Sequence, residues 1–326
     1  MNTIDRDAMN RAPWWLALLV VVVVASCDSG NGASGSRFMS FGTGGTGGIY
    51  YPLGGAIASL LSLADSNHQF TAEVTGGSVE NVNRVARGEM DLGLSMMTTI
   101  HRAYSGGPDF PEPLSRLRLV APVYPNRVHI VAARNSPVQS VADVRGRRVA
   151  VGSPGSGTEQ VAREVLAAYD LTYDDIDVRY LSFRESSDAL RDRAVDVAFF
   201  AAGYPVSAVL EVMTSRAARL LPIDREHQQV LTERFSYYRN GLIPSDAYPG
   251  VEDDVPTIMV MNWIVGREDL DPSVVRLMLD LLRNNRADLE RVHEISRQID
   301  LDFLLESTSI PFHAETERWI GEVLRE

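Results

Sequence analysis

The chain has 326 residues, with 31 basic and 43 acidic side chains and a formal net charge of −12 at pH 7. A chain this acidic, without a basic run, is a poor candidate for binding nucleic acid. All the basic residues are arginine, which excludes Walker-A phosphate loops, lysine Schiff bases and Ser-Lys catalysis.

The chain begins with a segment typical of an exported lipoprotein. Residues 14–25 are almost entirely apolar (WWLALLVVVVVA), which is too short to span a bilayer but fits a signal-peptide core. Val-Ala-Ser-Cys follows at 24–27 and resembles the bacterial lipobox, although a chance cysteine beside an apolar run is the alternative. We therefore expect a signal peptide over 1–26, lipid on Cys27, a flexible Gly/Ser-rich tether over 27–37, and a periplasmic protein anchored to a membrane.

Cys27 is the only cysteine, so the sequence offers neither a disulfide nor a thiolate metal site. The six histidines are scattered and form no paired i, i+4 metal motif. No Gly-x-Ser-x-Gly elbow occurs either. This repertoire favours binding over catalysis, and we expect no cofactor and no bound metal.

From residue 38 to 124 the pattern alternates strands with helices. Short β-rich runs are expected at 38–41, 70–74, 91–95 and 117–124, and helices at 51–64, 78–87 and 98–104. The glycine-rich run FGTGGTGGIYYPLGG (41–55) joins the first strand to the first helix. This rhythm predicts a mostly parallel sheet covered by helices, with a ligand crevice at the strand-to-helix turns.

The same alternation of strands and helices then starts again. Strands are expected at 128–134, 148–151, 178–182 and 195–201, and helices at 140–144, 159–169, 186–193 and from Pro205. A second glycine turn, 152–157, occupies the place equivalent to 42–48. A loop over 243–256, a strand over 257–265 and helices over 272–285 and 286–299 complete the chain. The sequence therefore predicts two α/β lobes, with a ligand cleft between them.

The two glycine turns predict the ligand contacts. Glycines leave backbone N–H groups accessible, and each following helix adds unpaired N–H groups and partial positive charge, which favours a carboxylate or phosphate. The expected contacts are Gly45, Thr46, Gly47, Gly48, Tyr50, Tyr51, Ser78, Ser95, Met97, Ser153, Ser156, Gly157, Thr158, Gly203 and Tyr204. Arg127 and Arg184 are further candidates.

Each of these assignments has a structural alternative. The glycines can serve a turn that needs positive φ. Ser78 can cap a helix, Met97 can fill the core, and Tyr51 and Tyr204 can be packed structurally. An enzyme would instead use Gly42–Gly47 as a G-x-G-x-x-G dinucleotide fingerprint with Asp65 as the ribose acid. A lone fingerprint is weak evidence, and Asp65 lies ahead of the next strand.

Six ordered blocks carry a resemblance to a known family: FGTGGTGGIYYPLGG, EVTGGSVENVNRVARGEMDLGLS, VAVGSPGSGT, VDVAFFAAGYP, AYPGVEDDVPTIMV and SIPFHAETERW. They are similar to the TAXI family, the extracytoplasmic solute-binding subunits of tripartite ATP-independent periplasmic (TRAP) transporters. The resemblance implies a two-lobed type II periplasmic-binding-protein fold, a small carboxylate ligand such as glutamate or a dicarboxylate, and membrane transporter subunits as partners.

The resemblance also implies lobe boundaries. Lobe one would comprise 38–126 and 262–326, and lobe two 127–261. One departure is the segment Ser-Met-Met-Thr-Thr at 95–99, which stands where relatives often carry a glutamine, asparagine or aspartate segment. A sensor lipoprotein that reports its ligand to a membrane histidine kinase would use the same fold, and neighbouring genes would separate the two functions.

Overall fold

The computed structural model describes residues 36–107 and 109–325. The expected signal peptide, the lipidation site Cys27 and nearly all of the expected tether lie outside these residues. In the part of the chain that the structure describes, no helix is both long and apolar enough to cross a membrane. Residues from Arg37 onward form one compact unit.

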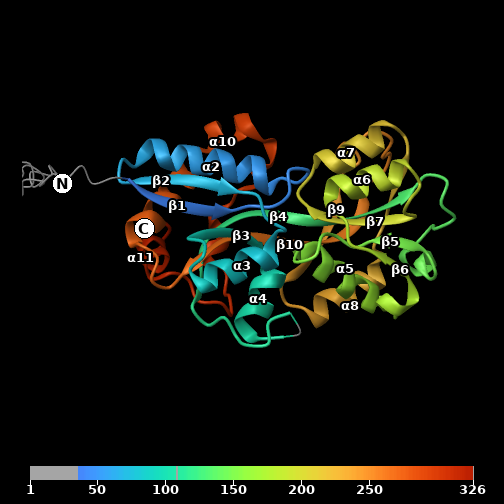
Figure 1. Ribbon diagram of the computed structural model, residues 1–326, viewed down its shortest axis with the longest axis horizontal. Helices are drawn as coiled ribbons and strands as arrows, with labels where there is room; N and C mark the ends of the chain where they lie inside the picture. The colour runs from blue at the N-terminus through green and yellow to red at the C-terminus, as the bar shows by residue number, and fades with distance from the viewer. Residues whose placement is uncertain (1–35, 108, 326) are drawn as a thin grey trace, which may run out of the picture. The chain divides into compact units, whose positions relative to one another are not determined.

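That unit is built on a ten-stranded mixed sheet (Figure 1). The main path of the sheet runs β2-β1-β3-β10-β4-β7-β5-β6, with β8 on β4 and β9 on β10. β1 is parallel to β2 and β3, and β5 is parallel to β6 and β7. The strands are β1 Arg37–Gly42, β2 His68–Glu73, β3 Leu92–Met96, β4 Leu117–Ala133, β5 Arg148–Ala150, β6 Asp177–Arg179, β7 Val197–Ala202, β8 Ala218–Leu221, β9 Tyr238–Ile243 and β10 Val255–Arg267.

Helices connect the strands, and more helices follow β10. They are α2 Tyr50–Ala64, α3 Ser78–Arg87, α4 Met97–Ser105, α5 Gly157–Ala168, α6 Phe183–Arg191, α7 Ser207–Thr214, α8 Arg225–Arg234, α9 Pro272–Asn284, α10 Arg286–Val292 and α11 Ala314–Val323. Short 3₁₀ helices occur at Val141–Val144, Tyr173–Asp175, Glu294–Gln298 and Leu301–Leu305. The helix expected over 286–299 therefore ends early, because His293 has extended backbone angles and caps the 3₁₀ turn after it.

The long antiparallel strands β4 and β10 join the two halves of the sheet. β4 pairs with β10 as far as Arg127, and from Arg127 onward it pairs with β7 and β8. β10 pairs with β9 up to Val260 and with β3 from Asn262. Both strands thus change partners within a few residues of the lobe boundaries expected at 126/127 and 261/262. The division into lobes itself stays a prediction.

The expectation of two separate strands at 117–124 and 128–134 is wrong, because β4 runs unbroken through Pro125. Proline lacks the N–H that a ladder needs, so it interrupts most central strands. Here the pairing of β4 with β10 shifts register between Met261 and Trp263, opposite this proline. Such an irregularity is where a strand tolerates proline.

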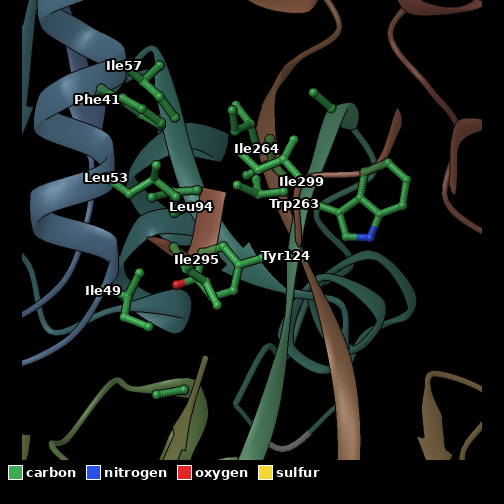
Figure 2. Close-up of a cluster of buried hydrophobic side chains, with 14 of the residues drawn as sticks. Phe41, Ile49, Leu53, Ile57, Leu94, Tyr124, Trp263, Ile264, Ile295 and Ile299 are labelled. Carbon is green, nitrogen blue, oxygen red and sulfur yellow. The ribbon is translucent and has the colours of Figure 1, made fainter. Parts of the chain in front are cut away.

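The hydrophobic core nearest the candidate site lies between α2 and the sheet. Leu53, Ile57 and Leu61 recur at four-residue spacing along α2 and are fully buried. Figure 2 shows Leu53 and Ile57 beside Phe41 of β1 and Leu94 of β3, with Ile295 and Ile299 closing the cluster from the C-terminal segment. This packing fixes the position of α2, whose first turn follows the first glycine turn directly.

Candidate functional site

A cavity of about 300 Å³ lies where the strand-to-helix turns of both halves of the sheet meet. Its walls come from the segments that follow β1, β2, β5 and β6, and from the last residues of β3 and β7. This is the edge at which open α/β sheets place ligands. The volume is at the lower end of the range for small-molecule sites, about 300–1,000 Å³, so the ligand that fits is small.

Four helices begin at this cavity. Tyr50, Ser78, Gly157 and Phe183 are the first residues of α2, α3, α5 and α6, and all four line it. The first turn of a helix presents N–H groups without intrahelical partners and a partial positive charge. Ser156 and Ser182 cap α5 and α6 with their side chains, whereas α2 and α3 have no side-chain cap. The sequence predicted two such helix ends behind the glycine turns, at α2 and α5, and named Ser78 at the start of α3 as a further candidate; α6 was not predicted to begin here.

The first glycine turn packs directly against α6. The N–H of Gly48 donates to the carbonyl of Gly45 at 3.1 Å and closes the turn. A Cβ atom on Gly47 would lie 3.2 Å from the backbone nitrogen of Arg184, so glycine allows this close approach. The Ser207 hydroxyl donates to the Gly47 carbonyl at 3.1 Å. This turn, which follows β1, is therefore held against helices from the other half of the sheet.

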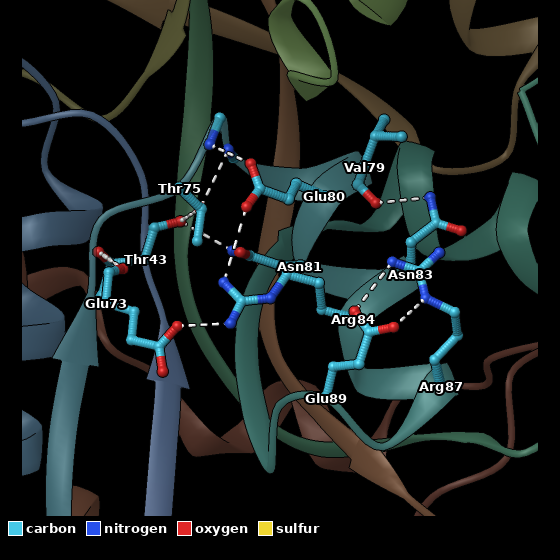
Figure 3. A network of polar contacts seen from close by, with 12 residues as sticks. Thr43, Glu73, Thr75, Val79, Glu80, Asn81, Asn83, Arg84, Arg87 and Glu89 are labelled. Carbon is cyan, nitrogen blue, oxygen red and sulfur yellow. Dashed lines mark hydrogen bonds and ion pairs between the residues drawn. The ribbon is translucent and has the colours of Figure 1, made fainter.

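Hydrogen bonds fix the turn before α3 (Figure 3). The Thr75 hydroxyl donates to the carbonyl of Thr43 at 3.0 Å and accepts the N–H of Gly77 at 3.1 Å. The Glu80 carboxylate accepts the N–H of Gly76 at 2.7 Å. Gly77 has φ +113°, a conformation that residues with a side chain rarely adopt. The turn therefore presents α3 to the cavity in one fixed orientation.

The two halves of the sheet touch where α3 and α5 begin. The N–H of Glu80 donates to the carbonyl of Gly155 at 3.3 Å. A Cβ atom on Gly157 would lie 2.9 Å from Ser78 Oγ and 2.2 Å from Met96 Cε. The absence of a side chain at Gly157 therefore lets the two helix ends meet, and the cavity is closed on this side.

Three lining hydroxyls accept backbone N–H groups. Ser78 Oγ accepts from Met96 at 3.2 Å, Ser156 Oγ from Glu159 at 3.3 Å, and Thr158 Oγ1 from Ala201 at 3.4 Å. A hydroxyl that accepts a hydrogen bond keeps its own proton for donation. Each of these three hydroxyls therefore still has its own proton available for donation.

A buried amide pair supports the floor of the cavity. Asn262 donates to Asn126 Oδ1 at 2.7 Å and Asn126 donates to Asn262 Oδ1 at 3.1 Å, so the pair is reciprocal. Asn126 also donates to the Ala201 carbonyl at 3.1 Å, and the Tyr50 hydroxyl donates to Asn262. Burial raises the pKa of Tyr50, which therefore stays protonated as this donor. The pair joins β4 to β10 at the point where both strands change partners.

Ten of the fifteen expected ligand contacts line this cavity, although ligand contact itself stays a prediction. They are Gly45, Thr46, Gly47, Gly48, Tyr50, Ser78, Ser153, Ser156, Gly157 and Thr158. Both glycine turns thus reach one site, as their equivalent places in the two halves of the chain predicted.

The other five lie away from the cavity. Tyr51 points toward solvent, with 39% of its surface exposed, and Ser95 is fully buried with its hydroxyl on the carbonyl of Met96. Met97 lines a separate cavity. The side chains of Ile49 and Ile295 take the space beside Gly203, and the Tyr204 ring lies 4.7 Å from the Arg127 guanidinium. One position before Met97, Met96 lines the main cavity instead.

Several lining residues were not among the predicted contacts. Asn126, Tyr124 and Thr75 lie on or after strands that the sequence identified, but nothing in the sequence marks them as facing a ligand. Ser182 and Phe183 were missed because the expected helix started at Ser186, whereas Arg184, named as a further candidate, does line the cavity. The pattern Ser182-x-x-Glu185 is a capping box that places the helix start correctly, with the Ser182 hydroxyl accepting from the N–H of Glu185.

Residues 36–107 and 109–325 contain no group of three or more His, Cys, Asp or Glu residues placed to hold a metal ion. The described lining contains one charged side chain, which is positive. Within the described lining, Arg184 is the only charged residue, and it lies at an exposed position. The arrangement suits a small anion held by backbone N–H groups and hydroxyls.

Solved structures share this fold at low sequence identity. A protein of Bordetella bronchiseptica RB50 is 16% identical, with 89% of this chain and 82% of that one covered and a TM-score of 0.54. The binding protein component of an ABC phosphonate transporter from Pseudomonas aeruginosa is 12% identical, with 81% and 80% covered and a TM-score of 0.51. The alkanesulfonate-binding protein SsuA from Xanthomonas axonopodis pv. citri, bound to MOPS, is 17% identical over 87% and 83%, with a TM-score of 0.49.

The first two likenesses, with TM-scores above 0.5, confirm the expected α/β fold of periplasmic binding proteins. A family model identifies the chain more specifically. It matches residues 41–323, which span every strand-to-helix turn that lines the cavity. The chain therefore belongs to the NMT1-like family.

Proposed function

We propose that this protein is an extracytoplasmic solute-binding protein that captures a small anionic solute and delivers it to membrane transporter subunits. The observation that carries the proposal is the convergence of four helix N-termini on one small cavity. Aligned N–H groups and helix dipoles bind anions without a dedicated cation. A single positive side chain, Arg184, adds to this potential from the rim.

The donor set also favours binding over turnover. The described lining contains hydroxyls, backbone N–H groups and one arginine, but neither a histidine nor a carboxylate that would act as a general base. Each hydrogen bond to an ionised group contributes about 1.5–3 kcal/mol. Four or five such bonds, less the ordering costs, suffice for binding near the roughly −8 kcal/mol of a micromolar complex.

The sequence resemblance to the TAXI family supports a carboxylate ligand, a glutamate-like amino acid or a dicarboxylate, and TRAP-type membrane subunits as partners. The structural likeness to the binding component of a phosphonate transporter supports a competing ligand class, because phosphonates are also small anions, with a tetrahedral head group in place of the planar carboxylate. We favour the carboxylate, since six ordered sequence blocks carry that resemblance and the likeness at 12% identity reflects the fold.

The proposed extracytoplasmic location rests on the expected signal peptide. The apolar run 14–25 and the Val-Ala-Ser-Cys sequence ending at Cys27 support export and lipid attachment. A lipid on Cys27 would keep the binding domain near the membrane subunits that receive its solute. The tether over 27–37, rich in glycine and serine, would let the domain turn toward them.

Titration calorimetry of the domain from residue 37 onward tests the proposal. The series comprises glutarate, succinate, L-glutamate, methylphosphonate, methanesulfonate and glucose. We expect saturable one-to-one heat with a carboxylate, and none with glucose. Binding of methylphosphonate alone would replace the carboxylate by a phosphonate, whereas binding of glucose alone would contradict an anion site altogether.

A further inference from the structure

Several hydrogen-bond acceptors around the cavity are occupied by the protein itself. Six lining residues have carbonyl groups that already accept a hydrogen bond at 2.8–3.1 Å: Gly45, Gly47, Gly77, Tyr124, Ser153 and Ala201. Their donors are backbone N–H groups, the Ser207 hydroxyl and the amides of Asn126 and Asn262. A ligand entering this cavity therefore meets the N–H groups of four helix ends, whereas these six carbonyl groups are already in use.

Carboxylates of the protein are absent from the described lining as well. Glu80, Glu159 and Glu185 stand in the first turns of α3, α5 and α6, but none of them lines the cavity. Each already has a partner. Glu80 accepts the N–H of Gly76 at 2.7 Å, Glu159 pairs with Arg163 at 2.5 Å, and Glu185 accepts the N–H of Ser182 at 2.8 Å.

An α-ammonium group has the opposite requirement from a carboxylate. It is a cation with three N–H donors, and each donor needs an acceptor once the group leaves water. Near four helix N-termini it is also repelled by their partial positive charge. The same surroundings favour a carboxylate, which is acceptor-only when ionised. The lining thus discriminates between two acids that differ in the amine alone.

We propose that the solute is an amine-free carboxylic acid rather than an amino acid. This inference rests on the proposed function and narrows it, because the TAXI resemblance by itself leaves both classes open. The discriminating feature is the match between donor-rich walls, formed by Ser78, Ser156, Thr158 and the helix ends, and a ligand that only accepts hydrogen bonds.

Matched ligand pairs test the inference by calorimetry on the same protein. Glutarate is compared with L-glutamate, and succinate with L-aspartate, since each pair differs only by the α-ammonium group. We expect the amine-free acid of at least one pair to bind about ten- to a hundredfold more tightly, the effect of leaving an ammonium group unpaired.

A variant that adds an acceptor to the lining shifts the preference toward the amino acid. Ser156→Asp retains the N-cap of α5, because aspartate is a good capping residue, and it adds a carboxylate to the lining. We expect the ratio of L-glutamate to glutarate affinity to rise at least tenfold over wild type. The corresponding change in the cap of the 3₁₀ helix Tyr173–Asp175, Thr172→Asp, lies away from the cavity and should leave that ratio unchanged.

The outcomes separate the inference from the proposed function. L-Glutamate binding as tightly as glutarate, or more tightly, would overturn the amine-free assignment and leave the carboxylate-binding function standing. An unchanged ratio in Ser156→Asp would also overturn it, since missing acceptors would then not set the preference. Heat from none of the four acids would instead contradict the proposed carboxylate-binding function, and the inference with it.

Discussion

Gly157 decides whether the helix ends of α3 and α5 can meet, which makes Gly157→Ala the most direct test of a closed binding site. The added Cβ atom would lie 2.2 Å from Met96 Cε, 2.9 Å from Ser78 Oγ and 3.1 Å from Ser78 Cβ. The Met96 methyl group is the end of a flexible side chain and can move. Ser78 cannot move easily, because it starts α3 and holds the N–H of Met96. The two helix ends must therefore separate by a few tenths of an ångström.

Overpacking of this kind costs about 1–3 kcal/mol. We expect the two helix ends to separate in an open state without ligand, so the cost falls on the closed state in which they touch. We expect Gly157→Ala to weaken glutarate binding about five- to 150-fold. The melting temperature without ligand should not fall, because alanine is the better helix former at a helical position by about 1 kcal/mol.

Gly55→Ala is the matched control. It makes the same change within α2, and no heavy atom lies within 4 Å of the added Cβ position. Calorimetry gives the affinities, and small-angle scattering with and without glutarate reports whether each protein compacts. Equal affinities for the two variants, together with equal compaction, would refute the reasoning that closure brings α3 and α5 into contact.

Three other perturbations have defined outcomes. Thr158→Val removes the hydroxyl of a residue that lines the cavity, so calorimetry should show about ten- to a hundredfold weaker binding of glutarate. Unchanged affinity would mean that the Thr158 hydroxyl does not contact the ligand. Hydrogen bonds from Arg148 hold the pKa of Asp196 in the folded protein below its usual value. The ionised carboxylate therefore stabilises the fold fully above its unfolded pKa of about 3.9, and this contribution is lost as the pH falls through the lower pKa of the folded state. Asp196→Asn should therefore lower the melting temperature at pH 7, with a difference that shrinks below about pH 4, and a constant difference would contradict this. Cys27→Ser should release the protein from membranes or leave its precursor unprocessed, and unchanged membrane fractionation and mobility would argue against lipidation.

The sequence predicted the glycine turns well because their residue types are informative by themselves. A run such as Gly-Thr-Gly-Gly-Thr-Gly-Gly cannot extend a strand or a helix, so it locates a turn, and the strand before it locates the sheet edge. α3 begins and ends as expected, at Ser78 and Arg87, because a glycine precedes it and Gly88 ends it in the left-handed conformation. Local chemistry determined these features, and the sequence contains all of it.

Longer-range features could not be derived in the same way. Pro125 indicates a strand break from local rules, yet β4 continues because β10 supplies a shifted register opposite it. The short strands β8 and β9 have weak local signals and exist because β4 and β10 offer them an edge. β8 pairs with residues of β4 that lie 85–91 positions earlier, and even β9, which is near β10 in sequence, needs that strand to be in place before it can pair.

The residues that line the cavity likewise divide into those marked by local sequence and those placed by long-range contacts. Gly157 was predicted from a turn motif, but its role depends on Ser78, a residue 79 positions earlier that only the assembled sheet brings opposite. Asn126 and Asn262 are ordinary polar residues in the sequence, and they become a reciprocal pair because β4 and β10 run antiparallel at this point. Their amides occupy the Ala201 and Tyr124 carbonyls, which removes two acceptors from the ligand's reach. The proposed preference for an anion therefore has a basis in the glycine turns of the sequence, whereas the proposed exclusion of an amine depends on contacts that exist only in the folded sheet.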